Sequence, residues 1–386
     1  METFDFDTVP CRRGTQSVKW DSDPDPEMLP LWVADMDFRC APAIIDALRR
    51  RVDHGVFGYT HPGKEYYDAV TGWFSRRHNW TINPDTIIYT TGVVPAISAV
   101  IKGLTKPGEG VIVMTPVYTC FYSSIRNNGC RTVSCPMTRT ADSYAIDFEA
   151  FERCCAEPTN TMFILCNPHN PGGRVWTPEE LRRIDEICGR HHVTVVSDEI
   201  HCEMVFLPGG YTPYANVSTH PCVICCAPSK AFNTAGLQTA NIVCADAGMR
   251  ARIDRAINDN ETCDIGPMGV TALIAAYNHG AGWLDAAVAY IADNYRYLCE
   301  RVAAMPGGWK VLTLEGTYLA WVDITAMGMT SGALSEALKR QAHVWFTPGT
   351  EYGAEGEGYL RINLATSRAI LAEALDRTEA YLRKTL

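Results

Sequence analysis

One lysine in this sequence stands where its amine could act as a nucleophile. Residues 223–226 form a short apolar run typical of a buried strand, and the Ala227-Pro228 pair breaks that run just before Lys230. Open α/β folds bind ligands at the carboxyl ends of their strands. Partial desolvation there would lower the pKa of Lys230 and free its amine, as a Schiff-base lysine requires. An ordinary surface lysine after a strand fits this stretch equally well, so the rest of the chain must decide.

The elements that would position Lys230 alternate between strand and helix. Short apolar runs predict strands at 87–90, 111–114, 162–166 and 193–196, and helical spacing over 178–191 follows Thr177 as N-cap. This alternation indicates an α/β fold with a mostly parallel sheet. Polar side chains stand just after these strands, so we expect one edge of the sheet to gather Tyr118, Asn170, Asp198 and Lys230. Packing alone explains that convergence poorly.

A second local pattern could bind an anion. Thr91 and Gly92 follow the strand at 87–90, and Val93 and Val94 lead through Pro95 into residues 96–104, which have helical spacing. Free amide groups and the positive end of a helix dipole at such a turn can cradle a phosphate. Glycine turns also serve purely steric purposes in α/β proteins, and neither the GxGxxG nor the Walker A spacing is present here.

Composition limits the class of protein. The 386 residues are 47% hydrophobic and 20% charged, which is typical of a globular protein of roughly two domains. The formal net charge of -10 with no basic block argues against a nucleic-acid partner. No apolar run approaches the ~20 residues that span a bilayer, so we expect no membrane segment.

The 16 cysteines lack the spacing of a disulfide scaffold, and the chain shows no apolar targeting segment at its start. We therefore expect reduced, packed thiols and a cytoplasmic protein. Cys222 and Cys225 form a lone CxxC inside a predicted strand, with no second pair to complete a metal site. We expect no metal centre.

Several motifs, in order along nearly the whole chain, resemble those of one enzyme family. NPHNPGGR (167–174), SDEIH (197–201) and PSKAFNTAGL (228–237) look like landmarks of pyridoxal-phosphate enzymes of the aspartate aminotransferase fold, fold type I. WVADMDF (32–38), GTYLAW (316–321) and YLRINLA (359–365) make the chain more similar to the MalY/PatB group of carbon-sulfur lyases, the cystathionine β-lyases. Their joint specificity is high although each motif alone is modest.

The resemblance implies roles around the ring of pyridoxal 5'-phosphate. Lys230 matches the lysine that binds this cofactor covalently, and Asp198 matches the aspartate that keeps the pyridine nitrogen protonated. Asn170 matches the asparagine bonded to the ring hydroxyl, and Tyr118 the aromatic residue stacked on the ring. His201 falls where aminotransferases place a tyrosine on the ring hydroxyl. Without the resemblance, a turn cap, an NP turn and a core tyrosine would explain Asp198, Asn170 and Tyr118.

The resemblance also implies residues for the phosphate. Gly92 and Val93 match its backbone cup, and Ser229 adds a hydroxyl. Tyr59 matches a tyrosine that reaches the phosphate of the neighbouring subunit, which implies a homodimer with shared active sites; a half-buried packing tyrosine is the alternative. The sequence departs from many relatives at Ala227, where they have a serine, and at Gln238, where an arginine binds the phosphate. Both departures put the affinity for the cofactor in question.

Arg361 lies in an otherwise apolar strand predicted over 358–365, where a lone arginine needs an anion. It matches the arginine that clamps the substrate α-carboxylate through two parallel hydrogen bonds. A structural ion pair with a protein carboxylate is the alternative.

We expect three regions. Residues 1–45 form an N-terminal arm that packs with the small domain, and residues 46–285 form the large cofactor-binding domain. Residues 286–386 form a smaller C-terminal α/β domain. In this smaller domain we expect a helix over 290–304 and strands over 318–324, 344–347 and 359–365. Arg361 belongs to the smaller domain, so domain closure would bring it over the cofactor.

These expectations together predict a carbon-sulfur β-lyase that cleaves L-cystathionine or a related cysteine S-conjugate to a thiol, pyruvate and ammonia. Two alternatives stay open. An aminotransferase would use the same residues to move an amino group to a 2-oxo acid, and sequence spacing does not separate the two reactions. A non-catalytic regulatory or binding protein could keep the fold and the cofactor.

Overall fold

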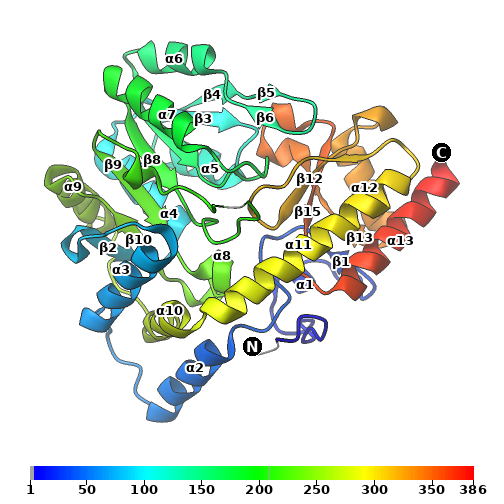
Figure 1. Cartoon of the computed structure of the whole chain (residues 1–386), viewed down its shortest axis with the longest axis horizontal. Helices are drawn as coiled ribbons and strands as arrows, with labels where there is room; N and C mark the ends of the chain where they lie inside the picture. The colour runs from blue at the N-terminus through cyan, green and yellow to red at the C-terminus, as the bar shows by residue number, and fades with distance from the viewer. Residues whose placement is uncertain (1–3, 208) are drawn as a thin grey trace.

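The computed structural model describes residues 4–207 and 209–386 and contains two main sheets flanked by helices (Figure 1). The larger sheet has the strand order β2-β10-β9-β8-β7-β3-β4. Only β10 runs antiparallel to its neighbours. The bounds of these strands are β2 Ile87–Thr90, β3 Gly110–Thr115, β4 Arg131–Pro136, β7 Asn160–Cys166, β8 Thr194–Asp198, β9 Cys222–Cys226 and β10 Ala240–Val243. The predicted α/β fold with a mostly parallel sheet is therefore confirmed.

Helices cover both faces of the larger sheet, because its strands carry apolar side chains on both sides. In β7, Phe163 and Leu165 belong to one core, whereas Met162 and Ile164 belong to another. The first core receives α3 (Lys64–His78), α6 (Phe148–Ala156), α7 (Pro178–Arg190) and α10 (Pro267–His279); the second receives α4 (Val93–Leu104), α5 (Thr119–Asn127) and α9 (Ala247–Asn258). Thr177 caps α7 as predicted, and Glu180 completes a capping box.

The smaller sheet lies in the C-terminal third of the chain, with the order β11-β12-β15-β14. Its strands are β11 Lys310–Val311, β12 Leu319–Asp323, β14 Thr347–Pro348 and β15 Tyr359–Asn363. The helices α11 (Ala281–Ala304), α12 (Ser331–Ala342) and α13 (Arg368–Thr385) accompany it, and Figure 1 shows α11 running beside α13. β5 (Thr138–Arg139) and β6 (Tyr144–Ala145) form a separate hairpin.

The N-terminal residues pack against the C-terminal part of the chain that holds the smaller sheet. β1 (Leu29–Pro30) pairs in parallel with β13 (Val344–Trp345), after a short helix α1 (Val18–Asp21). α2 (Pro42–His54) then packs on α10. The expected arm over residues 1–45 is thus mostly irregular but holds two short elements, and its residues 1–3 lie outside the described part. The two boundaries between the three predicted regions stay a prediction.

Two predicted elements differ from the structure by more than a few residues or in their pairing. The helix expected over 290–304 begins at Ala281, because Gly280 and Gly282 masked its start in the sequence pattern. The strand expected over 344–347 is two strands, since β13 pairs with β1 and β14 with β15. Within residues 4–207 and 209–386, every helix is too short or too polar to cross a membrane.

Candidate functional site

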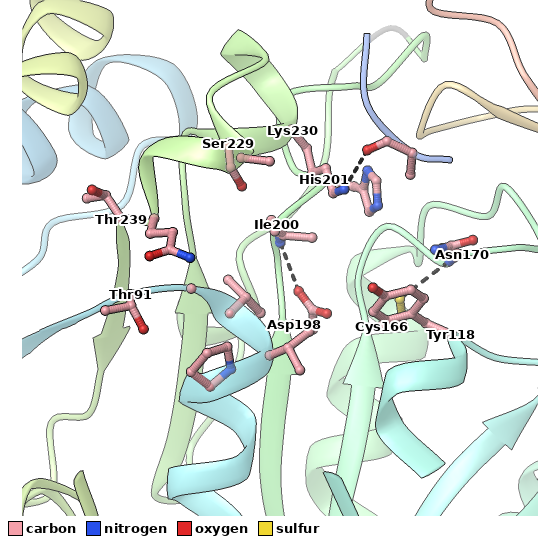
Figure 2. Close-up of a pocket in the computed structure, with 17 residues that line it drawn as sticks. Thr91, Tyr118, Cys166, Asn170, Asp198, Ile200, His201, Ser229, Lys230 and Thr239 are labelled. Atoms are coloured by element: carbon pink, nitrogen blue, oxygen red, sulfur yellow. Dashed lines mark hydrogen bonds between the residues drawn. The ribbon is translucent and has the colours of Figure 1, made fainter. Parts of the chain in front are cut away.

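A cavity of about 280 Å³ opens at the carboxyl ends of β2, β7, β8 and β9 (Figure 2). The parallel strands bring their terminal residues to this edge, as predicted. The cavity is lined by Ala34, Thr91, Gly92, Val93, Val94, Pro95, Tyr118, Cys166, Asn170, Asp198, Ile200, His201, Ser229, Lys230, Ala235, Gln238 and Thr239. The structure therefore brings together eight of the ten predicted site residues, all except Tyr59 and Arg361.

Lys230 lies in α8 (Ser229–Phe232), a single turn that begins just after β9. Its Nζ atom donates a hydrogen bond of 2.5 Å to the carbonyl oxygen of Ala34. The amine borders the cavity but is surrounded by protein atoms, and this burial lowers the pKa of Lys230 to about 8. The charge of Arg361 lowers this pKa further, whereas Asp35 and Asp198 oppose the shift. A larger share of the amine is thus unprotonated near neutral pH than in an exposed lysine.

Asp198 ends β8 and is almost fully buried, with an exposed fraction of 4%. The backbone N–H of Ile200 donates to its Oδ1 atom over 3.1 Å. Burial raises the pKa of Asp198 to about 7, and the neighbouring Glu199 adds to the rise. A buried carboxyl of this kind would be stabilised in its ionised form by a cationic partner in the cavity.

The N-terminus of α4 forms another wall of the cavity. Gly92 is its N-cap and has no side chain that could bond the first amides of the helix, which belong to Val93 and Val94. Exposed amides and the positive end of the helix dipole together favour an anion. Of the two positions that depart from many relatives, Gln238 lines the cavity, whereas Ala227 is buried in the core and does not line it.

Arg361 in β15 is buried just beyond the cavity and contacts one of its lining residues. Its guanidinium donates to Oδ1 of Asn170 over 3.2 Å and to the carbonyl oxygen of Trp32 over 2.7 Å. Its Nε atom is buried without a hydrogen-bond partner among the described residues. No carboxylate of residues 4–207 and 209–386 lies within ion-pair distance of the Arg361 guanidinium, so the alternative of a structural ion pair finds no partner there.

Two further predicted residues, His201 and Tyr59, lie in different places. His201 lines the cavity, its Nδ1 atom is buried without a hydrogen-bond partner in the described chain, and burial holds the pKa of its imidazole well below the usual value. Tyr59 lies away from the cavity in the loop before α3 and is 100% exposed. A single chain therefore does not bring Tyr59 to the site.

The sequence reasoning missed several residues of the cavity wall, one of which contributes a backbone group. Ala34 contributes its backbone carbonyl from the WVADMDF segment. The Sγ atom of Cys166 accepts a hydrogen bond from the backbone N–H of Asn170 over 3.4 Å (Figure 2). Thr239 adds a further wall from the residue before β10. The motif containing Ala34 was recognised, but only the three-dimensional structure shows which of its atoms faces Lys230.

Comparison with known proteins places the chain among enzymes. Residues 26–377 match the family model described as aminotransferase class I and II. The chain is 41% identical to cystathionine beta-lyase PatB of Bacillus subtilis, over 98% of this chain and 100% of that protein. It is 36% identical to protein MalY of Escherichia coli, over 96% and 97% of the two chains. The crystal structure of cystalysin from Treponema denticola, which contains a pyridoxal 5'-phosphate cofactor, superposes with a TM-score of 0.96 at 33% identity and full coverage of both chains.

Proposed function

The chain belongs to the aminotransferase class I and II family, and from this premise we propose that it is a pyridoxal 5'-phosphate-dependent carbon-sulfur β-lyase. Its substrate is L-cystathionine or a related cysteine S-conjugate, and its products are a thiol, pyruvate and ammonia. The observation that carries the proposal is the meeting of a lysine amine of lowered pKa and a buried carboxyl group in one cavity. The PatB relative, named a cystathionine beta-lyase, supports the choice of reaction.

The cavity fits pyridoxal 5'-phosphate at three points. The uncapped N-terminus of α4 and the Ser229 hydroxyl suit the phosphate group. The buried Asp198 carboxyl suits a protonated ring nitrogen, because a cation would offset the cost of its ionisation. The unpartnered Nδ1 atom of His201 and the side-chain amide of Asn170 offer polar contacts for the ring hydroxyl. Tyr118 offers an aromatic face for the ring.

The residues divide the work of the reaction. When bound, the cofactor supplies an electron sink that stabilises negative charge on the substrate Cα. Arg361 binds the substrate carboxylate, which orients the Cα–H bond. The Lys230 amine takes the Cα proton, the Cβ–S bond breaks, and the sulfur leaves with the bonding electron pair as a thiolate. Hydrolysis of the remaining three-carbon unit gives pyruvate and ammonia.

The same proposal extends to the assembly and the cellular location. An exposed Tyr59 beside the exposed Val56 and Phe57 suits a homodimer in which Tyr59 reaches the phosphate of the neighbouring site. We propose a cytoplasmic location because all 16 cysteines are free thiols in the described structure and most of them are buried or half-buried.

The direct test incubates the purified holoenzyme with L-cystathionine, first without and then with a 2-oxo acid acceptor. The proposal predicts that thiol and pyruvate rise in equal amounts without the acceptor. Product formation that requires the acceptor, with no free thiol, would make the protein an aminotransferase instead. Binding of cofactor without either reaction would favour the non-catalytic alternative.

A further inference from the structure

The segment Trp32–Phe38 has almost no regular secondary structure, yet side chains from three parts of the molecule bind its carbonyl oxygens. From the smaller sheet, Arg361 donates to Trp32 and Asn363 donates to Val33 and Asp35. From the N-terminal arm, Arg12 donates to Met36, and Lys19 to Asp35. From α8 and the residue after it, Lys230 donates to Ala34, and Asn233 to Met36 and Phe38. This segment is thus a junction of the arm, the smaller sheet and the helix that carries Lys230.

Asn233 makes three hydrogen bonds to the segment, two of them to carbonyl oxygens and one to a backbone N–H. Its Oδ1 atom accepts from the Met36 N–H over 3.0 Å, and its Nδ2 atom donates to the carbonyl oxygens of Met36 (2.9 Å) and Phe38 (3.0 Å). Asn233 is the C-cap of α8 with a φ of 56°, a left-handed conformation that asparagine tolerates. It therefore joins the turn that holds Lys230 to a segment almost two hundred residues earlier in the chain.

The hydrogen bond between Lys230 and Ala34 lies next to these hydrogen bonds of Asn233 in the same segment. The Ala34 carbonyl oxygen accepts from the Lys230 amine over 2.5 Å and from the Tyr318 hydroxyl over 2.9 Å. Tyr318 is fully buried, so this side of the amine is shielded by protein. If the segment moved away, water would reach the amine and replace the carbonyl as its partner.

We propose that Asn233 is a positioning residue, which holds the segment Trp32–Phe38 closed over one side of the Lys230 amine and so shields that side from water. The proposal rests on the proposed function, because it concerns the amine that acts as the base there. Asn233 itself touches neither the substrate nor the reacting atoms.

The electrostatic surroundings of Lys230 are set by several elements, and a test must leave them unchanged. The charged or titratable groups that face it are Asp35, Cys120, Asp198, His201 and Arg361. Since the largest cause of its low pKa is burial, loss of closure should raise that pKa from about 8 toward the ordinary value. Asn233→Gly changes no charge, and glycine adopts the left-handed conformation at this position without cost.

The experiment titrates the Lys230 amine in the full chain after removal of the cofactor. The protein is acetylated briefly at a series of pH values, and modification of the Lys230 peptide is followed by mass spectrometry. We expect Asn233→Gly to raise the apparent pKa by about one unit, so that acetylation at pH 7.5 slows roughly five- to tenfold. The matched control is Asn79→Gly, which places the same change at the left-handed C-cap of α3 and should keep the wild-type midpoint.

Three outcomes would overturn the proposal. The first is a folded Asn233→Gly protein whose Lys230 acetylation has the wild-type pH midpoint, which would make Asn233 a merely structural residue. The second is an equal shift of that midpoint in Asn79→Gly. If the variant does not fold, hydrogen exchange of the wild type decides, because fast exchange of the Met36 amide would show that Asn233 does not hold it. The titration needs no turnover, so it remains informative even if L-cystathionine gives no pyruvate and the proposed function fails.

Discussion

Asp198 shows how the placement of one residue can favour chemistry at the expense of stability. The pKa of its buried carboxyl is about 7, against ~3.9 in an unfolded chain. Between these values the folded protein binds more protons than the unfolded one, so this residue makes the free energy of unfolding fall as pH rises. Above pH 7, where the carboxyl is ionised, burial of Asp198 lowers the free energy of unfolding by its full amount, at most about 4 kcal/mol. A cationic group bound in the cavity would offset it.

We therefore expect Asp198→Asn to raise the melting temperature of the cofactor-free protein at pH 8 and to change it much less at pH 4. Asparagine is nearly isosteric and cannot ionise, so it removes the cost only where the carboxyl would be charged. Thermal unfolding followed by circular dichroism at the two pH values measures this. An equal change at both would mean that the ionisation of Asp198 does not explain the effect.

Sequence reasoning at this scale located side chains but not backbone groups. Lys230 and Asp198 were found because polar residues rarely follow buried strands without a reason. The Ala34 carbonyl and the hydrogen bonds of Asn233 were missed, since every residue has a carbonyl group and these contacts join residues far apart in the sequence. Likewise, the sequence motif did not show that Arg361 bonds to Asn170.

At the scale of elements, the N-terminus of α4 is the part of the fold that suits a phosphate. Val93 is the first residue of this helix and one of the residues that line the cavity. Proline fits the first position of a helix but has no N–H to donate. We expect Val93→Pro to weaken cofactor binding about tenfold, as the loss of a hydrogen bond to a charged group should.

A fluorescence titration of the cofactor-free protein with pyridoxal 5'-phosphate measures this affinity. Ala247→Pro is the matched control, because Ala247 is the exposed first residue of α9, away from the cavity. Unchanged affinity in Val93→Pro, or an equal loss in the control, would remove this helix end from the cofactor site.

Element prediction succeeded where local pattern decides structure. The strand over 87–90 has the predicted bounds, and the runs at 111–114 and 162–166 lie inside β3 and β7, because continuous apolar stretches of this length suit a sheet covered on both faces. Pairing between distant segments was not predictable in this way. The pairing of β1 with β13 is an example, because each strand has only two residues and so short a sequence does not determine which strand it pairs with.

At the level of the whole molecule, the exposed position of Tyr59 motivates a test of the proposed homodimer. Its side chain is fully exposed in the single chain, whereas the resemblance assigns it to the phosphate of a neighbouring site. We expect that mixing Tyr59→Ala with Lys230→Ala subunits, under conditions that exchange subunits, restores activity. Hybrid dimers would make up about half of the dimers and carry one intact site each, which gives about a quarter of wild-type activity.

Lyase activity of the mixture, compared with that of each variant alone, measures this complementation. Sedimentation velocity on the same samples establishes whether dimers are present. Dimers that exchange without any gain in activity would place Tyr59 outside the neighbouring site, and a monomer with full activity would refute the shared site altogether.

The lyase reaction and the role of Lys230 can be tested together by pyruvate release from L-cystathionine. The wild type and Lys230→Ala are each loaded with pyridoxal 5'-phosphate and assayed without a 2-oxo acid acceptor. We predict equal amounts of pyruvate and thiol from the wild type. We predict a rate lower by at least about 10²–10⁴ from Lys230→Ala, because that variant lacks the base. A wild type that releases no pyruvate, or a Lys230→Ala variant that releases it at the wild-type rate, would contradict the account.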